Sequence, residues 1–401
     1  MQRRAVLRLG LGAAAAGALG KSAVCHAQGV QSGLLPLQLL RTGDIGGLPV
    51  VEIALGGRPT RWLVDSGATT ALIEPALAAT LGLSRLAPVR VATAGGAQTR
   101  ERFALPDLPV LGAPGAGSPA VAVDLDAVLG EAGGALDGLL GAPWLRTVAT
   151  RFDFAGGELR WSATAEPAAN AAVLPLRWDG GLPVASLELG ARPAEGFLFD
   201  TGNAGALVVF ARRARALLDD AGMLPEMTLR ELGGSVRVRY ARIDRLGAAG
   251  WRARDVPAAL EAGANARRGA HFDRLAGSLG NALFESGAVT LDGPGSRLIV
   301  ELPGLPEPAP LPGGFGLVLT RRSGSALAIG AVIEGGPAAT AGVGPGDAVL
   351  AIDGNDVRTA TPAQAWQMLA KREAATFELA SGDAPPRRVR LQRERFFPPL
   401  R

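Results

Sequence analysis

The sequence is nearly without cysteine and histidine, and each shortage excludes a class of chemistry. Among 401 residues, Cys25 is the single cysteine, and His26 and His271 are the two histidines. Cys25 and His26 fall within residues 1–27, which have the pattern of a removable leader. The remaining chain therefore offers no disulfide, no thiolate nucleophile, no cysteine-ligated metal site and no two-histidine zinc site. A Ser-His-Asp triad would have to use His271.

Excess charge is also lacking once residues 1–27 are set aside. The formal net charge is +4, but four basic residues and no acidic residue lie in that segment, leaving 37 of the 41 basic residues against 37 acidic ones. A balanced chain gives no charge argument for binding nucleic acid or an anionic membrane, and we expect neither partner.

Aromatic residues are sparse at 5% of the chain, whereas glycine and proline are abundant, with 56 and 29 residues. This composition favours short strands joined by turns over long helices. Hydrophobic residues make up 48% of the chain, enough for sizeable cores, and the length allows two or three domains. We therefore expect a mainly β protein.

Residues 1–27 have the pattern of an export signal. A basic start is followed by an apolar run at 9–19 and a small-residue exit ending in Ala27. The apolar run has secretory-signal length and is short for a bilayer span. The pair Arg3-Arg4, followed by an apolar residue and another arginine, resembles the twin-arginine signal, which we favour over a general secretory leader. We expect an exported, periplasmic protein whose mature chain has no membrane span.

Two segments of the chain repeat each other. Residues 47–67 read GLPVVEIALGGRPTRWLVDSG and residues 181–202 read GLPVASLELGARPAEGFLFDTG. Each copy passes through a strand-like alternation of apolar and polar residues to an aspartate, a hydroxyl residue and a glycine. These tripeptides are Asp65-Ser66-Gly67 and Asp200-Thr201-Gly202. One such tripeptide is a common turn former, but two in a collinear repeat indicate two homologous lobes.

The repeat continues beyond the two aspartates. Double glycines between strand-like segments predict a hairpin tip in each lobe, at Gly95-Gly96 and Gly233-Gly234. An apolar stretch with two glycines follows, and the interval from aspartate to its last glycine is 76 residues to Gly141 and 80 residues to Gly280.

Two lobes that each supply one carboxylate can place the pair face to face. Close carboxylates cannot easily both ionise, so they share a proton, and one can act as base while the other acts as acid. Asp65 and Asp200 are therefore the candidate catalytic residues, as in an aspartic peptidase. Carboxylates alone would activate the water, so we expect no cofactor and no metal.

The C-terminal region has a different pattern. The run Ala341-Gly342-Val343-Gly344-Pro345-Gly346-Asp347 resembles the PDZ domain, and Phe315, Gly316 and Leu317 match its carboxylate-binding loop. The resemblance implies a groove in which an extended C-terminal peptide adds as a strand. Alternatively, Phe315 and Leu317 are only core residues.

The two copies resemble the lobe of retropepsin-type aspartic proteases. Two fused lobes followed by a PDZ-like domain resemble a bacterial group of secreted aspartyl-protease-like proteins. The resemblance implies a bilobal β fold with a substrate cleft, followed by an α+β PDZ domain. We expect an export signal at 1–27, lobes at 34–165 and 172–302, a proline-rich linker at 303–312 and the PDZ domain at 313–395.

The resemblance also implies roles for residues around the aspartates. Gly67 and Gly202 would let the backbone pass close to the carboxylates and donate N–H groups to them. Ser66 and Thr201 would brace the two loops against each other. The double glycines would form flaps that close over a peptide or protein substrate.

The second lobe departs from the pattern. Asn203 follows its second glycine, where the first lobe has Ala68, and we expect it to bind the outer oxygen of the carboxylate or to disturb proton sharing. Ala276 and Ser278 likewise replace Asp137 and Leu139. Three readings stay open: an exported aspartic endopeptidase, a non-catalytic peptide-binding scaffold with the same cleft and groove, and a peptidase restricted to one partner protein.

Overall fold

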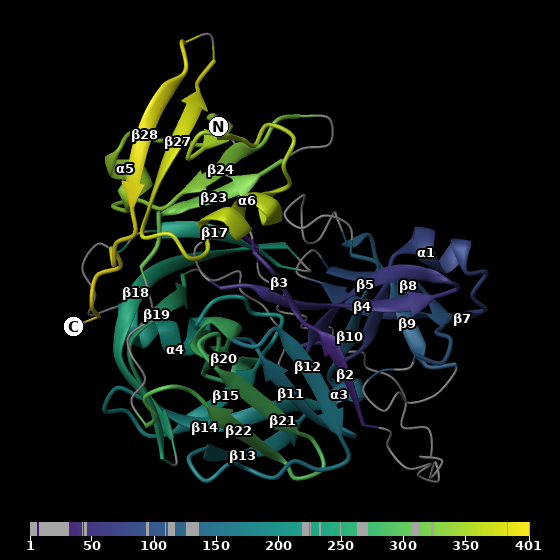
Figure 1. Ribbon diagram of the computed structural model, residues 1–401. Helices are drawn as coiled ribbons and strands as arrows, with labels where there is room; N and C mark the ends of the chain where they lie inside the picture. The colour runs from purple at the N-terminus through teal and green to yellow at the C-terminus, as the bar shows by residue number, and fades with distance from the viewer. Residues whose placement is uncertain are drawn as a thin grey trace.

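The computed structural model shows two β-rich lobes and a C-terminal domain (Figure 1). It describes the residues in this list: 6–7, 32–41, 43, 46–93, 96–108, 110, 117–125, 136–218, 224, 226–231, 234–248, 250–262, 272–306, 313–321, 325–382 and 384–400. The expectation of a mainly β chain is confirmed. His271, most of the expected linker and most of the predicted export signal lie outside the described residues.

The first lobe is built on an eight-stranded sheet with the order β3-β4-β5-β10-β6-β9-β8-β7. Its elements, with the two short helices, are β3 (Gln38–Leu40), β4 (Leu48–Leu55), β5 (Arg58–Asp65), β6 (Ala71–Ile73), α1 (Pro75–Thr80), β7 (Arg85–Thr93), β8 (Gly96–Ala104), β9 (Pro119–Ala122), β10 (Gly138–Gly141) and α3 (Ala142–Leu145).

The second lobe repeats this arrangement within a larger sheet. Its elements are β14 (Leu182–Leu189), β15 (Glu195–Phe199), β16 (Leu207–Val209), α4 (Ala211–Leu218), β17 (Glu226–Glu231), β18 (Gly234–Ala248), β19 (Trp251–Glu261), η2 (Phe272–Arg274), β20 (Gly277–Leu279) and η3 (Asn281–Leu283). The two-residue strand β1 (Val6–Leu7) pairs in parallel with β17.

The internal repeat of the sequence is visible in both burial and topology. Strands β4 and β14 have the same alternation of buried and exposed side chains, residue for residue. In the first lobe β10 is parallel to β5 and antiparallel to β6, which is parallel to β9. Strands β20, β15, β16 and β19 repeat these relations in the second lobe. Identical patterns of pairing place the ends of β5 and β15 in equivalent positions.

The lobes are joined by strands that sequence analysis assigned to each lobe separately. The list of these strands is β2 (Gly33–Pro36), β11 (Ala149–Asp153), β12 (Glu158–Ser162), β13 (Ala172–Asp179), β21 (Ala288–Asp292) and β22 (Arg297–Glu301). They follow the order β2-β12-β11-β21-β22-β13, in which β11 pairs antiparallel with β21. The hairpin β11–β12 at the end of the first lobe and the hairpin β21–β22 at the end of the second thus form one shared sheet. Each hairpin leaves an unpaired edge that the other covers.

The C-terminal domain is a small sheet with two helices, drawn in yellow-green at the top of Figure 1. Its elements are β23 (Leu317–Thr320), β24 (Ala328–Val332), α5 (Pro337–Thr340), β25 (Ala348–Ile352), β26 (Asn355–Asp356), α6 (Pro362–Leu369), β27 (Ala374–Ala380) and β28 (Arg387–Gln392). The sheet order is β23-β24-β25-β27-β28, so β23 is an edge strand. Thr361 caps α6, since its Oγ1 accepts the N–H of Gln364 at 3.2 Å and its own N–H bonds the Gln364 side chain.

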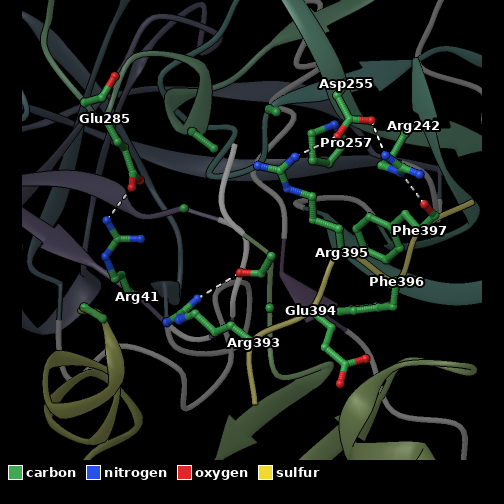
Figure 2. A pocket seen from close by; sticks show the side chains of 18 of the residues that line it. Arg41, Arg242, Asp255, Pro257, Glu285, Arg393, Glu394, Arg395, Phe396 and Phe397 are labelled. Atoms are coloured by element: carbon green, nitrogen blue, oxygen red, sulfur yellow. Dashed lines mark hydrogen bonds and ion pairs between the residues drawn. The ribbon is translucent and has the colours of Figure 1, made fainter. Parts of the chain in front are cut away.

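The chain after this domain returns to the second lobe. Arg242 of β18 donates its N–H to Pro398 O at 2.8 Å and accepts the N–H of Leu400 at 2.8 Å. Phe397 stacks on Tyr240 with ring centroids 4.7 Å apart, and its carbonyl accepts from the Arg242 side chain (Figure 2). The C-terminal residues therefore attach the domain to the part of β18 that pairs with β19.

No helix among the described residues is long and apolar enough to span a bilayer.

Candidate active site

Two aspartates lie at equivalent strand ends. Asp65 is the last residue of β5, and Asp200 directly follows β15. Both side chains are buried, with exposures of 0% and 3%. Their carboxyl groups are in contact with each other, as the repeat predicted for a pair facing each other between two lobes.

The glycines beside the aspartates explain how the carboxyl groups come so close. The N–H of Gly67 donates to Asp65 Oδ1 at 2.8 Å, and that of Gly202 donates to Asp200 Oδ1 at 3.0 Å. A Cβ on Gly67 would lie 2.3 Å from Asp200 Oδ1, and one on Gly202 would lie 2.5 Å from the Asp65 carboxyl. Each glycine therefore packs against the opposite aspartate, and no other residue fits there without displacing it.

Ser66 and Thr201 hold the two loops together through reciprocal hydrogen bonds. The N–H of Ser66 donates to Thr201 Oγ1 at 2.9 Å, and the N–H of Thr201 donates to Ser66 Oγ at 3.0 Å. Each hydroxyl then donates across the interface, Ser66 to Phe199 O and Thr201 to Val64 O, both at 2.7 Å. All four bonds are buried, where water cannot replace a lost partner. They therefore fix the position of one carboxylate relative to the other.

The electrostatics favour a neutral Asp65. Burial raises the pKa of Asp65 from its ordinary value near 3.8 to about 7, although hydrogen bonds from Gly67, Gly202 and Ala68 and contact with Asp200 act to lower it. Asp65 Oδ2 has no well-formed hydrogen bond to any described residue. A proton held at Asp65 beside a second carboxyl is the charge state that general acid–base chemistry requires.

The raised pKa predicts a specific pH dependence of stability. Between about pH 4 and 7 the folded chain keeps the proton on Asp65 whereas the unfolded chain releases it, so unfolding releases a proton and stability falls as pH rises. The slope from this group is about 1.4 kcal/mol per pH unit at most. Asp65→Asn removes the titration, and urea unfolding should show the variant gaining stability over the wild type from pH 4 to 7. Parallel curves across this range would contradict the assignment.

Asn203 does not bind the carboxylate, contrary to one expectation from the sequence. Its Nδ2 donates to Ser278 Oγ at 3.2 Å, and its Oδ1 accepts the N–H of Gly205 at 3.0 Å. Ala68 and Leu139 occupy the equivalent positions of the first lobe, where both belong to one apolar cluster. The second lobe therefore has a buried polar contact at this place, where the Asn203 amide bonds Ser278 and Gly205.

Replacing Asn203 therefore tests whether its role is structural. Asn203→Ala leaves the buried N–H of Gly205 without its acceptor, and we expect a loss of stability on the order of 2 kcal/mol. The loss should be the same at pH 4 and pH 7, because the amide does not contact the carboxyl pair and should leave its titration unchanged. Urea unfolding at the two pH values measures both effects, and a loss that differs between them would show that the amide acts on the pair.

The structure adds a residue that the sequence analysis did not select. Asn281 donates from Nδ2 to Thr201 O at 2.8 Å and to Gly47 O at 2.9 Å, joining the loop after β15 to the segment before β4. Its N–H also bonds Asn203 O at 2.9 Å. The first lobe has Ala142 at this position, directly after the last glycine of the repeat. The difference between alanine and asparagine at this position is visible when the sequences of the two lobes are aligned, and it could have identified Asn281.

The expected flaps correspond to two antiparallel hairpins. Thr93 pairs with Gly96 at the end of β7–β8, and Glu231 pairs with Gly234 at the end of β17–β18. Gly95 and Gly233 lie outside the described residues. Closure of these hairpins over a substrate stays a prediction.

The residues predicted for peptide binding lie at the start of the C-terminal domain. Phe315 and Leu317 are buried in its core, where the Phe315 ring packs edge-on against Phe377 and beneath the Arg393 guanidinium. Gly316 has φ +74°, which favours glycine. Their side chains serve the core, so a contribution to binding would come from the backbone of this loop.

Among the described residues, no group of three or more histidine, cysteine, aspartate or glutamate side chains is placed to hold a metal ion.

Comparison with known proteins supports this architecture. Residues 51–144, which include Asp65, match the model of the aspartyl protease family, and residues 329–380 match that of the PDZ domain. The crystal structure of Basic 7S globulin from soybean is similar at 12% identity over 67% of this chain and 96% of that one, with a TM-score of 0.36. Comparison with curated proteins gave no match. The chain contains an aspartyl protease domain and a PDZ domain, within the expected mainly β fold.

Proposed function

We propose that the protein is an aspartic endopeptidase in which Asp65 and Asp200 form one catalytic pair. The observation that carries the proposal is the contact between two buried carboxyl groups at equivalent strand ends. The matched family model covers Asp65 alone, and the internal repeat extends the assignment to Asp200. Because both lobes are in one chain, the pair is complete without a second copy.

In this proposal the pair shares one proton, and the burial of Asp65 favours the proton on that residue. The ionised partner, Asp200, takes a proton from a water molecule as the water attacks the peptide carbonyl carbon. Asp65 donates its proton to the carbonyl oxygen, which gives a tetrahedral gem-diol. When the C–N bond breaks, the proton taken up by Asp200 passes to the leaving amine, and one hydroxyl of the gem-diol returns a proton to Asp65 as the product carboxyl group forms. The bonds between Ser66 and Thr201 keep the two carboxyl groups in register during this exchange.

The proposal also includes export of the protein and binding of a peptide by its PDZ domain. The basic and apolar pattern of residues 1–27 supports export to the periplasm, with the twin-arginine route favoured by Arg3-Arg4. The PDZ domain supports binding of a peptide, either a substrate or a partner protein.

A cleavage assay on a diverse peptide library tests this function. Residues 28–401 are incubated with the library from about pH 3 to 8, a range that brackets the titration of a carboxyl pair. Cleavage that disappears in Asp65→Asn supports the peptidase. The absence of cleavage at every pH would contradict a general endopeptidase and would favour a peptide-binding scaffold or a peptidase restricted to one partner.

A further inference from the structure

The peptide-binding edge of the PDZ domain can be located in the sheet. Strand β23 pairs with β24 on one side and is otherwise the edge of its sheet. PDZ domains bind an extended peptide by adding it as a strand at this edge. The occupant of the β23 edge is therefore the ligand of the groove.

This edge is paired with another part of the same chain. Gly43 forms an antiparallel bridge with Val318 in the middle of β23. A Cβ on Gly43 would lie 3.5 Å from Val318 Cγ2 and 3.8 Å from Leu317 O, so the two backbones are in close contact. Gly43 also lines a cavity of about 300 Å³ together with Trp366 and Ala370 from the α6 region. Gly43 thus pairs with the edge of β23 where a peptide ligand would add, and it lies beside a cavity that residues of the α6 region also line.

The residues on both sides of Gly43 are fixed to the second lobe. Arg41 forms an ion pair with Glu285 (Figure 2). The other oxygen of Glu285 accepts the N–H of Gly47 at 2.7 Å. Gly46 has φ +71°, and a Cβ there would lie 1.9 Å from Ala204 O. One glutamate therefore binds Arg41 and Gly47, which lie on either side of Gly43 in the chain. Because these residues are already held in place, Gly43 loses little further freedom when it pairs with β23, which lowers the entropic cost of filling the groove.

The same residues reach the catalytic loop of the second lobe. Gly47 O accepts from Asn281 Nδ2, and this amide also donates to Thr201 O, directly after Asp200. Helix α6 contributes Ala363 to the first-lobe cluster that contains Leu40 and Leu48, which flank the segment. The groove, the segment and the second catalytic loop are therefore connected by direct contacts.

We propose that the PDZ groove holds an internal ligand, the Gly43 segment, meaning the described residues Arg41, Gly43, Gly46 and Gly47. An external peptide with a free C-terminus then binds by displacing this segment. If the internal ligand fills the groove 99% of the time, the apparent affinity for an external peptide is about 100-fold weaker than that of the open groove. The proposal concerns binding alone and does not depend on cleavage.

The test compares released and locked forms of the full chain in an Asp65→Asn background, which prevents cleavage of the probe. The probe is a fluorescein-labelled synthetic peptide of residues 38–47, QLLRTGDIGG, whose binding is followed by fluorescence anisotropy. Arg41→Ala with Gly43→Pro removes the ion pair and disrupts the strand pairing, which releases the segment. Arg85→Ala is the matched control, because it breaks an exposed pair with Glu101 elsewhere in the first lobe.

The locked form carries Gly43→Cys and Val318→Cys. With Cys25→Ser these are the only two thiols, and the contact between the two positions suits a disulfide. The disulfide is expected to form, and the oxidised form should not bind the probe. The released form should bind at least about 10-fold more tightly than the wild type and Arg85→Ala.

Three outcomes would overturn the proposal. The two thiols could remain free under oxidising conditions, which would place Gly43 away from Val318. The wild-type, released and locked forms could bind the probe equally, which would place the probe outside the groove. A released form that keeps its unfolding midpoint yet does not bind the probe would show that the groove has no affinity for this segment.

Discussion

Replacing Asp200 by asparagine is expected to lower kcat at least ~10³-fold while leaving the fold intact. The loss follows because the variant removes the group that takes the proton from water, and acid–base catalysis contributes factors of this order. The fold should survive because the amide oxygen of asparagine can still accept the N–H of Gly202, as Asp200 Oδ1 does now. Steady-state kinetics on a cleaved peptide measures the effect, and thermal unfolding checks the fold.

Asp153→Asn is the matched control for this prediction. Asp153 lies at the end of β11, and its Oδ1 accepts the N–H of Gly156 at 2.8 Å in a turn that asparagine can also make. Its replacement should leave kcat unchanged. An Asp200→Asn variant as active as Asp153→Asn would remove Asp200 from the mechanism.

The second large effect is expected at the contact between the lobes. Thr201→Val removes the acceptor of the Ser66 N–H and the donor to Val64 O, both buried. Leaving two buried polar groups unpaired costs on the order of 3 kcal/mol. The loosened carboxyl pair should also lower kcat/KM roughly 100-fold, since small displacements of catalytic groups have effects of this size. Urea unfolding and peptide kinetics measure the two consequences.

Thr150 provides the control for the change from threonine to valine. It is fully buried in β11, and its Oγ1 has no hydrogen-bond partner among the described residues. Thr150→Val replaces an unpaired hydroxyl by a methyl group, so stability should change by less than about 1 kcal/mol or increase. Equal losses in Thr150→Val and Thr201→Val would show that the reciprocal hydrogen bonds do not stabilise the interface specifically.

Most of the fold that could be predicted from the sequence follows from the internal repeat. The alternation in residues 48–55 and 182–189 predicts strands with one buried face, and both strands have the same burial pattern. Because pairing within each lobe follows the repeat, the expectation that Asp65 and Asp200 end equivalent strands required no knowledge of distant contacts.

Contacts between separate parts of the chain could not be predicted in this way. The pairing of β11 with β21 depends on which unpaired edges meet in the folded molecule, and the sequence of neither strand specifies its partner. The same holds for Arg242 and the residues near Pro398, and for Gly43 and Val318. Each pairing is made by backbone groups, which leave no pattern of side chains in the sequence.

The second lobe shows why departures from a family pattern need a structure to interpret. In sequence, Asn203 directly after the tripeptide Asp200-Thr201-Gly202 suggested interference with Asp200. In the structure its amide is engaged by Ser278 and Gly205, and Asn281 supports the same loop from the other side. The polar residues of this lobe satisfy one another, so they are compatible with an intact carboxyl pair.

The pH dependence of kcat/KM for a cleaved peptide tests the central claim most directly, because it reports the titration of the pair in the free enzyme. We predict a bell-shaped profile whose upper limb falls near pH 7, where Asp65 loses its proton, and a loss of the activity in Asp65→Asn. A profile that stays flat from about pH 3 to 8, or one that Asp65→Asn leaves unchanged, would contradict a catalytic pair formed by Asp65 and Asp200.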